Sequence, residues 1–341
     1  MAALGGVRGW PASVLGSVGV SDPAVAGALQ LAASALAPTT TAAYARVWAE
    51  FALFARQCGV LALPADRLLL ARWLWSRHAA GRGSGASRAL AAVRAVHIQL
   101  GYPDPTGDAW LQRVAAGAER LAALTRPPRE LRAPLPPAVV LDALRLVPDW
   151  LGTSAGPVGA QEAPAAAVLA LRDAAVMALG MRLMRRAGEI AALSTADVRA
   201  LPDGTVGVFV PRSKTDQLAK GLLLPLDATG GPACPVALLR RWLTVRPVLA
   251  ARGPGSDALF ITRTGEPLSR SAISSLVSRA ASAAGYEGRF SGHSLRIGGA
   301  TAAARGGASM ALIKAVGAWT SPAVQRYVRP FAGGLSAAMG F

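Results

Sequence analysis

The sequence predicts a mainly α-helical protein of two domains, with a small antiparallel β-sheet in the second. Its 341 residues exceed what one ordinary hydrophobic core holds, and 52% of them are hydrophobic. Most of this share is Ala and Leu, which favour helices. A Pro-rich stretch, residues 126–137, divides the chain, and a β-branched alternating segment follows it at Val206–Val210.

The first domain, residues 37–125, is predicted to contain four helices. Residues 1–36 are small and apolar, so we expect a flexible lead there with one short helix at most. Thr39–Thr41 offer N-caps to the first helix. Its aromatic residues recur at helical spacing, at Tyr44, Trp48, Phe51 and Phe54. The later helices are expected to carry Leu69, Trp73 and Trp75, to span Ser87–Leu100 and to span Trp110–Leu124.

The second domain, residues 138–330, is predicted to be mostly helical around a small sheet. Residues 126–137 form a stiff, basic linker, residues 151–163 a surface loop and residues 331–341 a C-terminal tail. The strands are expected at Val206–Val210, Leu222–Leu224 and Leu259–Ile261. The helices are expected at Ala138–Val147, Pro164–Gly180, Leu238–Leu249 and Arg270–Ala284, from about Leu295, at Met310–Val316 and around Val324–Tyr327.

Several classes of protein are disfavoured by the composition. We find no uninterrupted apolar run of about 18 residues and no secretory pattern at the N-terminus, so neither a membrane span nor a signal peptide is expected. Cys58 and Cys234 lie in different halves of the chain and are expected to be reduced, buried thiols of an intracellular protein. With only three histidines, a zinc site is not expected.

Charge is the strongest bulk signal. The chain has 36 Lys and Arg residues against 19 Asp and Glu, a formal net charge of +17. Almost all of the positive charge is arginine, which holds phosphate through two parallel N–H donors. A GC-rich genome would explain why arginine replaces lysine, but it would not explain the excess of bases over acids. We therefore expect a polyanionic partner, and nucleic acid is the first candidate.

Four short segments of the second domain carry the candidate chemistry. They are Arg185–Ile190, Ser213–Asp216, His293–Arg296 and Trp319–Tyr327. In this order they resemble the catalytic set of the tyrosine recombinase (phage integrase) family: Arg with Glu three residues on, Lys in a β-hairpin, His-x-x-Arg, His or Trp, then Tyr. The resemblance covers about residues 37–330. It implies a SAM-like core DNA-binding domain followed by a catalytic domain with the DNA breaking-rejoining fold.

One departure from the family's common spacing points to a particular subgroup of the family. Trp319 stands at the position that is His or Trp in the family, and Tyr327 follows eight residues later, where about nine is common. A Trp with this spacing, followed by Tyr, a hydrophobic residue and Arg, is similar to mobile-element recombinases of the Crypton and DIRS-like kind. A Trp in this place is also Cre-like.

The resemblance assigns the anion-binding and nucleophilic roles to three residues. Arg186 and Arg296 hold the non-bridging oxygens of the scissile phosphate and neutralise charge in the pentavalent transition state. Tyr327 is the nucleophile and forms a 3′-phosphotyrosyl link that stores the bond for rejoining. Because the arginines take the place of a metal and the link conserves the bond, no metal, ATP or other cofactor is implied.

Four more residues take supporting roles. His293, one helical turn before Arg296, is the base or holds an oxygen, and Lys214 is the general acid for the 5′-oxygen. Trp319 donates through its indole N–H but cannot shuttle protons. Glu189 orients the basic cluster.

Most of these residues also have a plain structural alternative, which for Arg185 and Arg186 is an arginine on a helix surface. Arg185 competes with Arg186, but the spacing to Glu189 favours Arg186. Lys220 competes with Lys214 on the same predicted hairpin, where a solvated turn lysine is the alternative. For His293, Trp319 and Tyr327 the alternative is a packed core side chain.

A further set of arginines is expected to face DNA phosphates, with an ordinary solvated helix face as the alternative. In the first domain and the linker they are Arg72, Arg77, Arg82, Arg88, Arg94, Arg126, Arg129 and Arg132. In the second domain, Arg270 and Arg279 lie on a helix suited to entering a groove. Trp48 and Trp73 are expected in the core rather than stacked on bases.

The resemblance implies a site-specific recombinase or integrase of a mobile element. Four protomers, a homo-tetramer on double-stranded DNA, would exchange strands through a Holliday junction. A type IB topoisomerase-like enzyme that relaxes supercoils is the nearest alternative, and an inactive DNA-binding protein is the alternative from another class. The expected location is inside the cell with DNA, in the nucleus or in a bacterial cytoplasm and nucleoid.

Overall fold

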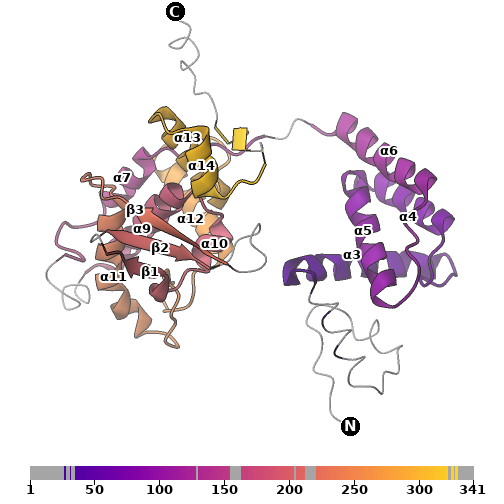
Figure 1. Cartoon of the computed structure of the whole chain (residues 1–341), viewed down its shortest axis with the longest axis horizontal. Helices are drawn as coiled ribbons and strands as arrows, with labels where there is room; N and C mark the ends of the chain where they lie inside the picture. The colour runs from indigo at the N-terminus through magenta and orange to yellow at the C-terminus, as the bar shows by residue number, and fades with distance from the viewer. Residues whose placement is uncertain are drawn as a thin grey trace, which may run out of the picture. The chain divides into compact units, whose positions relative to one another are not determined.

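The chain divides into two compact units, Met1–Arg129 and Glu130–Phe341. The computed structural model describes residues 27, 31, 35–127, 130–153, 163–202, 205–211, 220–321, 324–325 and 327–328. Figure 1 colours the first unit indigo to magenta and the second magenta to yellow. Across these described residues, every helix is too short or too polar to cross a bilayer.

The first unit is a helical bundle around an aromatic core. Its helices are α3 (Pro38–Gln57), α4 (Arg67–Ala79), α5 (Ala86–Gln99) and α6 (Ala109–Thr125), with a 3-10 turn η1 (Gly83–Gly85). Trp48, Phe51 and Trp73 are 6%, 0% and 1% exposed, and the rings of Phe51 and Trp73 lie 5.0 Å apart. The predicted core role of both tryptophans is confirmed. Trp75, on the same helix as Trp73, points outward and is 67% exposed.

The N-cap predicted for the first helix is wrong. The helix begins at Pro38, and Ala37 caps it without a side-chain hydrogen bond. Proline has a fixed φ and no N–H, so it suits the first helical position and places Thr39–Thr41 inside the helix. The Thr41 hydroxyl donates back to the Ala37 carbonyl oxygen at 3.4 Å.

The second unit is mostly helical with one small sheet. Its helices are α7 (Ala138–Leu144), α9 (Ala165–Leu183), α10 (Ala187–Ala191), α11 (Pro235–Ala250), α12 (Arg270–Ala283), α13 (Gly292–Arg305) and α14 (Met310–Gly317), with a 3-10 turn η2 (Thr195–Asp197). The strands β1 (Val198–Ala200), β2 (Val206–Val210) and β3 (Leu222–Leu226) form an antiparallel sheet in that order. The register pairs Val208 with Val198 on one side and with Leu224 on the other. The predicted fold class is confirmed.

The strand predicted at Leu259–Ile261 is wrong. The segment forms only isolated bridges, Ser194 with Ala258 and Ile261 with Pro267. Leu259 and Ile261 are both fully buried, so this apolar run marks core packing rather than a strand. The missed third strand is β1, whose three residues are too few for a periodic signal.

Helix α9 forms the centre of the second unit. Thirteen of its residues are buried, and it packs against α7, α11 and α13. The packing of α13 against α9 and against the segment around Leu135 depends on two adjacent glycines. A Cβ on Gly299 would overlap the carbonyl group of Met181, and one on Gly298 would overlap the carbonyl oxygen of Leu135. Backbone therefore meets backbone on both sides of α13.

The two ends of the predicted linker differ in their surroundings: one lies exposed at the end of α6, and the other packs into the second unit. Arg126 caps α6 and is exposed, whereas Ala133 and Leu135 donate backbone N–H groups to Arg289 and Ser294 at 3.0 Å each. Leu135 is 1% exposed within the main core of the second unit. The later part of the stretch therefore packs as part of the second unit and is not a free spacer.

The two cysteines are both free thiols, but only one of them is buried. Cys234 is 3% exposed at the start of α11. Cys58 is half-buried, and its Sγ accepts from the Arg72 guanidinium at 3.6 Å. The prediction of two buried thiols therefore holds only for Cys234.

Candidate active site

Arg186 and Glu189 are joined at the start of α10. Arg186 occupies the N-cap position and Glu189 the third position of the helix. The Glu189 carboxylate accepts from the Arg186 backbone N–H at 3.3 Å and from its guanidinium at 2.8 Å. Glu189 is 9% exposed, so a buried carboxylate fixes the direction of a half-buried guanidinium. The three-residue spacing noted in the sequence places the Glu189 carboxylate where it can reach back to Arg186 at the N-cap.

His293 and Arg296 lie one turn apart on α13. The N-terminus of the helix is capped by Ser291, whose hydroxyl accepts from the His293 N–H at 3.2 Å, while the Ser294 hydroxyl accepts from the Ser291 N–H. Arg296 is 1% exposed and donates through one nitrogen to the carbonyl oxygens of Met184 (2.6 Å) and Gly317 (2.7 Å). Arg296 therefore links the C-terminal ends of α9 and α14.

Trp319 covers Arg296. Its ring centroid lies 3.6 Å from the guanidinium carbon, and the residue is 8% exposed. The chain reaches this position through Ala318, which has a left-handed backbone with φ of 50°. A Cβ on Gly317 would overlap the indole ring, so only glycine at this position lets Trp319 fold back.

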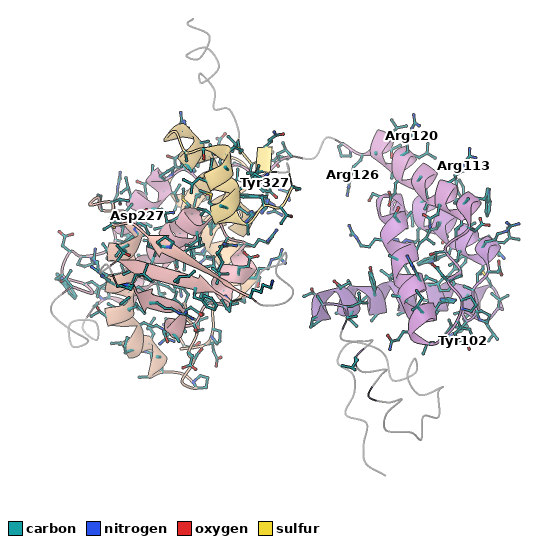
Figure 2. All side chains as sticks on the ribbon, in the orientation of Figure 1. Tyr102, Arg113, Arg120, Arg126, Asp227 and Tyr327 are labelled. Atoms are coloured by element: carbon teal, nitrogen blue, oxygen red, sulfur yellow. The ribbon has the colours of Figure 1, made fainter. Side chains whose placement is uncertain are left out.

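Tyr327 lies against the same cluster. Its ring centroid is 5.2 Å from that of His293 and 5.1 Å from that of Trp319, and the Arg296 guanidinium carbon is 5.7 Å away. The Tyr327 carbonyl oxygen accepts from the Thr301 hydroxyl at 3.0 Å, which ties the residue to α13. Figure 2 labels this half-buried side chain close to α14.

Unpaired donors gather in the cluster. Nε and one terminal nitrogen of Arg296 are buried without a hydrogen-bond partner, as is the indole nitrogen of Trp319. Burial, followed by repulsion from Arg186, lowers the pKa of Arg296 to about 10, although Glu189 and Tyr327 oppose the shift. At neutral pH the side chain remains a cation. The cluster therefore has unpaired hydrogen-bond donors and positive charge, the two properties that bind an anion.

A pocket of about 640 Å³ opens beside this cluster. Arg186, His293 and Glu189 line it together with Arg132 and Arg270. Two arginines that were predicted to face phosphates thus share a pocket with three of the predicted catalytic residues. Arg279 lies elsewhere, in a second pocket beside Asp173. Nine residues separate it from Arg270, which puts the two side chains on opposite faces of α12.

Two predicted residues lie outside the described part of the chain, namely Lys214 and Arg129. Lys214 belongs to the connection between the paired strands β2 and β3. Its competitor Lys220 is described and is exposed just before β3.

The predicted phosphate-facing arginines of the first unit differ in their surroundings. Arg72, Arg82, Arg88 and Arg94 are exposed. Arg77 is only 9% exposed, pairs with Glu50 at 2.6 Å and lies over the Trp73 ring at 5.2 Å. Trp73 and Glu50 draw Arg77 inward, so the alternative of a solvated helix face does not hold for it, and its contact with DNA phosphates stays a prediction.

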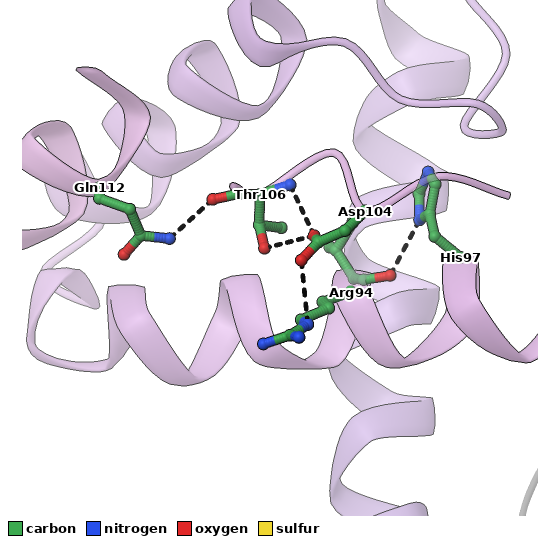
Figure 3. A network of polar contacts seen from close by, with 6 residues as sticks. Arg94, His97, Asp104, Thr106 and Gln112 are labelled. Carbon is green, nitrogen blue, oxygen red and sulfur yellow. Dashed lines mark hydrogen bonds and ion pairs between the residues drawn. The ribbon is translucent and has the colours of Figure 1, made fainter. Parts of the chain in front are cut away.

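Two of the exposed arginines are partnered by acids. Arg82 also pairs with Glu50, at 3.0 Å. Arg94 pairs with Asp104 at 3.0 Å in the network of Figure 3, where Asp104 also accepts from Thr106. Such exposed pairs contribute little stability and can exchange for other anions.

Sequence reasoning missed two exposed arginines of α6. Arg113 and Arg120 are seven residues apart and therefore share one face of the helix, with Arg126 beyond them (Figure 2). The seven-residue spacing was the signal available in the sequence. The described residues contain no group of three or more potential metal ligands.

Comparison with known proteins gives a family and a fold. Residues 160–332 match the sequence profile of the phage integrase family. An integrase/recombinase xerD homolog of Selenomonas ruminantium is 27% identical over 277 residues, which is 79% of this chain and 74% of that protein. The structure of a XerH site-specific recombinase bound to palindromic difH substrate has a TM-score of 0.55 at 14% identity and covers 94% of this chain and 90% of that one. A lambda integrase (75–356) dimer bound to a COC′ core site has a TM-score of 0.50 at 17% identity, with coverage of 88% and 91%.

Proposed function

This chain belongs to the phage integrase family and is a tyrosine-type recombinase acting in site-specific recombination on DNA, and from this premise we propose that Tyr327 is its nucleophile. The observation that carries the proposal is the meeting of Tyr327 with His293, Arg296 and Trp319. These side chains come from α13 and from the segment after α14, and they enclose donors that have no partner.

The proposed reaction is a transesterification. The Tyr327 hydroxyl oxygen attacks the phosphorus, the new bond joins phosphorus to the tyrosine, and the bond to the 5′-oxygen breaks. His293, whose ring is nearest, takes the phenol proton or holds a phosphate oxygen. Lys214 gives a proton to the departing 5′-oxygen. A second 5′-hydroxyl then reverses these steps and rejoins the strand.

The anion-binding groups of the site act on the phosphate throughout. Arg296 and Trp319 carry buried N–H donors with no partner among the described residues, and the phosphate oxygens supply acceptors for them. Arg186 reaches the same phosphate from the pocket side, held by Glu189. A second anionic charge develops in the pentavalent state, so donors that are already aimed stabilise it more than they stabilise the starting phosphodiester.

Binding outside the site is proposed to rest on phosphate contacts. The exposed arginines of the first unit, together with Arg132 and Arg270 beside the pocket, neutralise backbone charge, so affinity falls as salt rises. Four copies of the chain on two DNA sites are proposed to exchange strands through a Holliday junction. The protein would then work wherever the cell keeps its DNA, in a nucleus or in a bacterial nucleoid.

Covalent trapping tests this function. Nicked duplexes from the sequences that flank the gene are incubated with the full chain and separated on a denaturing gel. The expected result is a protein–DNA band that Tyr327→Phe abolishes. Tyr286→Phe is the matched control, because Tyr286 is half-buried against the core of the same unit and should leave the band unchanged. A band that survives Tyr327→Phe would exclude Tyr327 as the nucleophile.

The products distinguish the alternatives. A strand joined to a new partner indicates recombination, whereas relaxed circles without exchange indicate a topoisomerase-like activity. Salt-sensitive binding without any covalent band on these duplexes would favour a protein that only binds DNA.

A further inference from the structure

Arg185 is a buried cation without an adequate partner. It is 1% exposed, and its Nε and one terminal nitrogen are buried with no hydrogen-bond partner. No ion pair among the described residues includes it. Burial is the main cause that lowers its pKa, Glu189 opposes this shift and Arg186 adds to it. A guanidinium in this position is destabilising on its own, because its lost hydration is not replaced.

Of the other buried arginines that the structure describes, Arg172 and Arg246 are satisfied, and Arg77 pairs with Glu50 and leaves only its Nε without a partner. Arg172 pairs with Asp173 at 2.6 Å and donates to the Ile261 carbonyl oxygen, and Arg246 donates to the carbonyl oxygens of Ser256 and Ala258. The buried arginines that keep two nitrogens unpaired are Arg185 and Arg296, among the residues whose placement is known. Arg296 is the one that the family pattern assigns to the phosphate.

Arg185 also lies in the same cluster as Arg296. It stands between Met184, whose carbonyl oxygen accepts from Arg296, and Arg186 at the N-cap of α10. Its charge contributes to lowering the pKa of Arg296, so the two guanidiniums are electrostatic neighbours. Glu189 is the acid that acts on all three arginines, and its carboxylate is already bonded to Arg186. The cluster thus holds three guanidiniums against one carboxylate.

We propose that Arg185 is a further phosphate-binding residue of this site, whose unpaired nitrogens donate to an oxygen of the phosphodiester held by Arg186 and Arg296. The proposal rests on the proposed function for the identity of the ligand. The burial of Arg185 does not exclude this role, because Arg296 is buried to the same 1%. An apolar side chain would pack in this place without the desolvation penalty, so the cation is explained by an anion that enters the site.

The first test separates an anion-binding role from a structural one by the direction of a stability change. Arg185→Met is expected to raise the Tm of the full chain by about 2–4 °C, because it removes a buried unpaired charge. Arg246→Met is the matched control, because Arg246 is a buried arginine with its nitrogens bonded, and this variant should lower the Tm. A Tm for Arg185→Met that falls as it does for Arg246→Met would overturn the proposal.

The second test measures anion binding without DNA. Millimolar orthovanadate, a tetrahedral oxyanion, should raise the Tm of the wild-type chain more than sodium chloride of equal ionic strength does. Arg185→Met should lose most of this rise, and Arg185→Lys should keep part of it because it keeps the charge but not the planar fork. An unchanged rise in Arg185→Met, or no rise in the wild type, would contradict the proposal.

The third test returns to the reaction. Arg185→Met should slow formation of the covalent band by about 10- to 100-fold, as expected for a lost hydrogen bond between charged groups, while Arg246→Met should not slow it at a temperature where it is folded. If the wild type forms no covalent band but the orthovanadate result holds, the proposed function fails and the anion site stands. If the band forms at the same rate in Arg185→Met, the anion role of Arg185 fails and the proposed function stands.

Discussion

The indole ring of Trp319 lies face-on over the guanidinium of Arg296, 3.6 Å from ring centroid to guanidinium carbon. The contact combines a cation–π attraction with an indole nitrogen that is buried and unpaired. Trp319 thus has two separable properties. Its aromatic face shields Arg296 from water, and its N–H is available to an incoming acceptor.

Trp319→Phe should separate these two properties. Phenylalanine keeps an aromatic face over Arg296 but has no donor, so the free energy of unfolding should fall by only about 1–2 kcal/mol. The rate of covalent DNA attachment should fall about 10-fold, because one hydrogen bond to a charged oxygen is lost. Urea unfolding and single-turnover trapping measure the two effects. An unchanged rate would mean that the indole nitrogen does not serve the phosphate.

Gly317→Ala should displace Trp319. The new methyl group would overlap the indole ring, and the Gly317 carbonyl oxygen is also an acceptor for Arg296. We expect a loss of about 2–4 kcal/mol in unfolding free energy together with a strong loss of covalent attachment. Gly306→Ala is the control, because a Cβ there meets its nearest atoms at an ordinary 3.5 Å. Equal stability of the two variants in a denaturant titration would refute the overlap argument.

Arg88 and Arg77 should respond differently to substitution. Arg88 is exposed on α5, so Arg88→Ala should reduce the slope of log affinity for DNA against log salt by about 1 and leave stability within about 0.5 kcal/mol. Arg77→Met breaks the contacts with Glu50 and Trp73 and should cost about 1–3 kcal/mol, since Glu50 is 29% exposed and water screens part of the pair. Arg77→Met should not change the slope of log affinity against log salt. Fluorescence anisotropy titrations at several salt concentrations measure both slopes, and a reduced slope in Arg77→Met with an unchanged slope in Arg88→Ala would contradict the prediction.

His97 should make the first unit sensitive to acid. Its Nε2 accepts from the Ala65 N–H at 3.0 Å and its Nδ1 lies 2.9 Å from the Val93 carbonyl oxygen (Figure 3), so the neutral ring satisfies both contacts. Burial lowers its pKa below the ordinary value of 6.5, although the Val93 bond and Asp104 oppose the shift. The unfolded chain therefore binds more protons, and stability should be complete above pH 6.5 and decline as the pH falls below it.

The experiment compares wild type with His97→Gln across this range. Glutamine offers an acceptor near the same place but does not titrate. Unfolding of the full chain, followed by tryptophan fluorescence from pH 5 to 8, should show a flatter profile in the variant between about pH 5 and 6.5. Parallel profiles would exclude His97 as the source of the acid sensitivity.

The sequence predicted most of the helices and the central hairpin because their signals are local, but it missed the five-residue α10, and the helix expected around Val324–Tyr327 is not an α-helix in its described residues. Aromatic spacing identified α3, and β-branched alternation identified β2 with the bounds observed. The segment Leu259–Ile261 looked like a strand because an apolar run of three residues does not distinguish a strand from a buried coil.

The sequence also predicted which residues belong to the candidate site, but it did not predict how they contact one another. The order and spacing of Arg186, Glu189, His293 and Arg296 pointed to the cluster that the structure contains. The cover formed by Trp319 depends on a left-handed Ala318 and on the missing Cβ of Gly317, which no periodic pattern encodes. Burial of Arg77 depends on its contacts with Glu50 on another helix and with Trp73, which no local pattern encodes, and the burial of Arg185 has no signal in the sequence either.

The two glycines at the crossing of α13 have a consequence for anyone who tries to retarget this protein by random mutagenesis. Gly298 and Gly299 bring α13 against the main chain of Leu135 and Met181, with no side chain between them to be trimmed or enlarged. Repacking of side chains therefore cannot change the distance between the backbone of α13, which carries His293 and Arg296, and the backbone segments it packs against. Productive libraries should leave these two codons untouched and diversify exposed arginine positions such as Arg88, Arg113 and Arg120, where change leaves the chemistry in place.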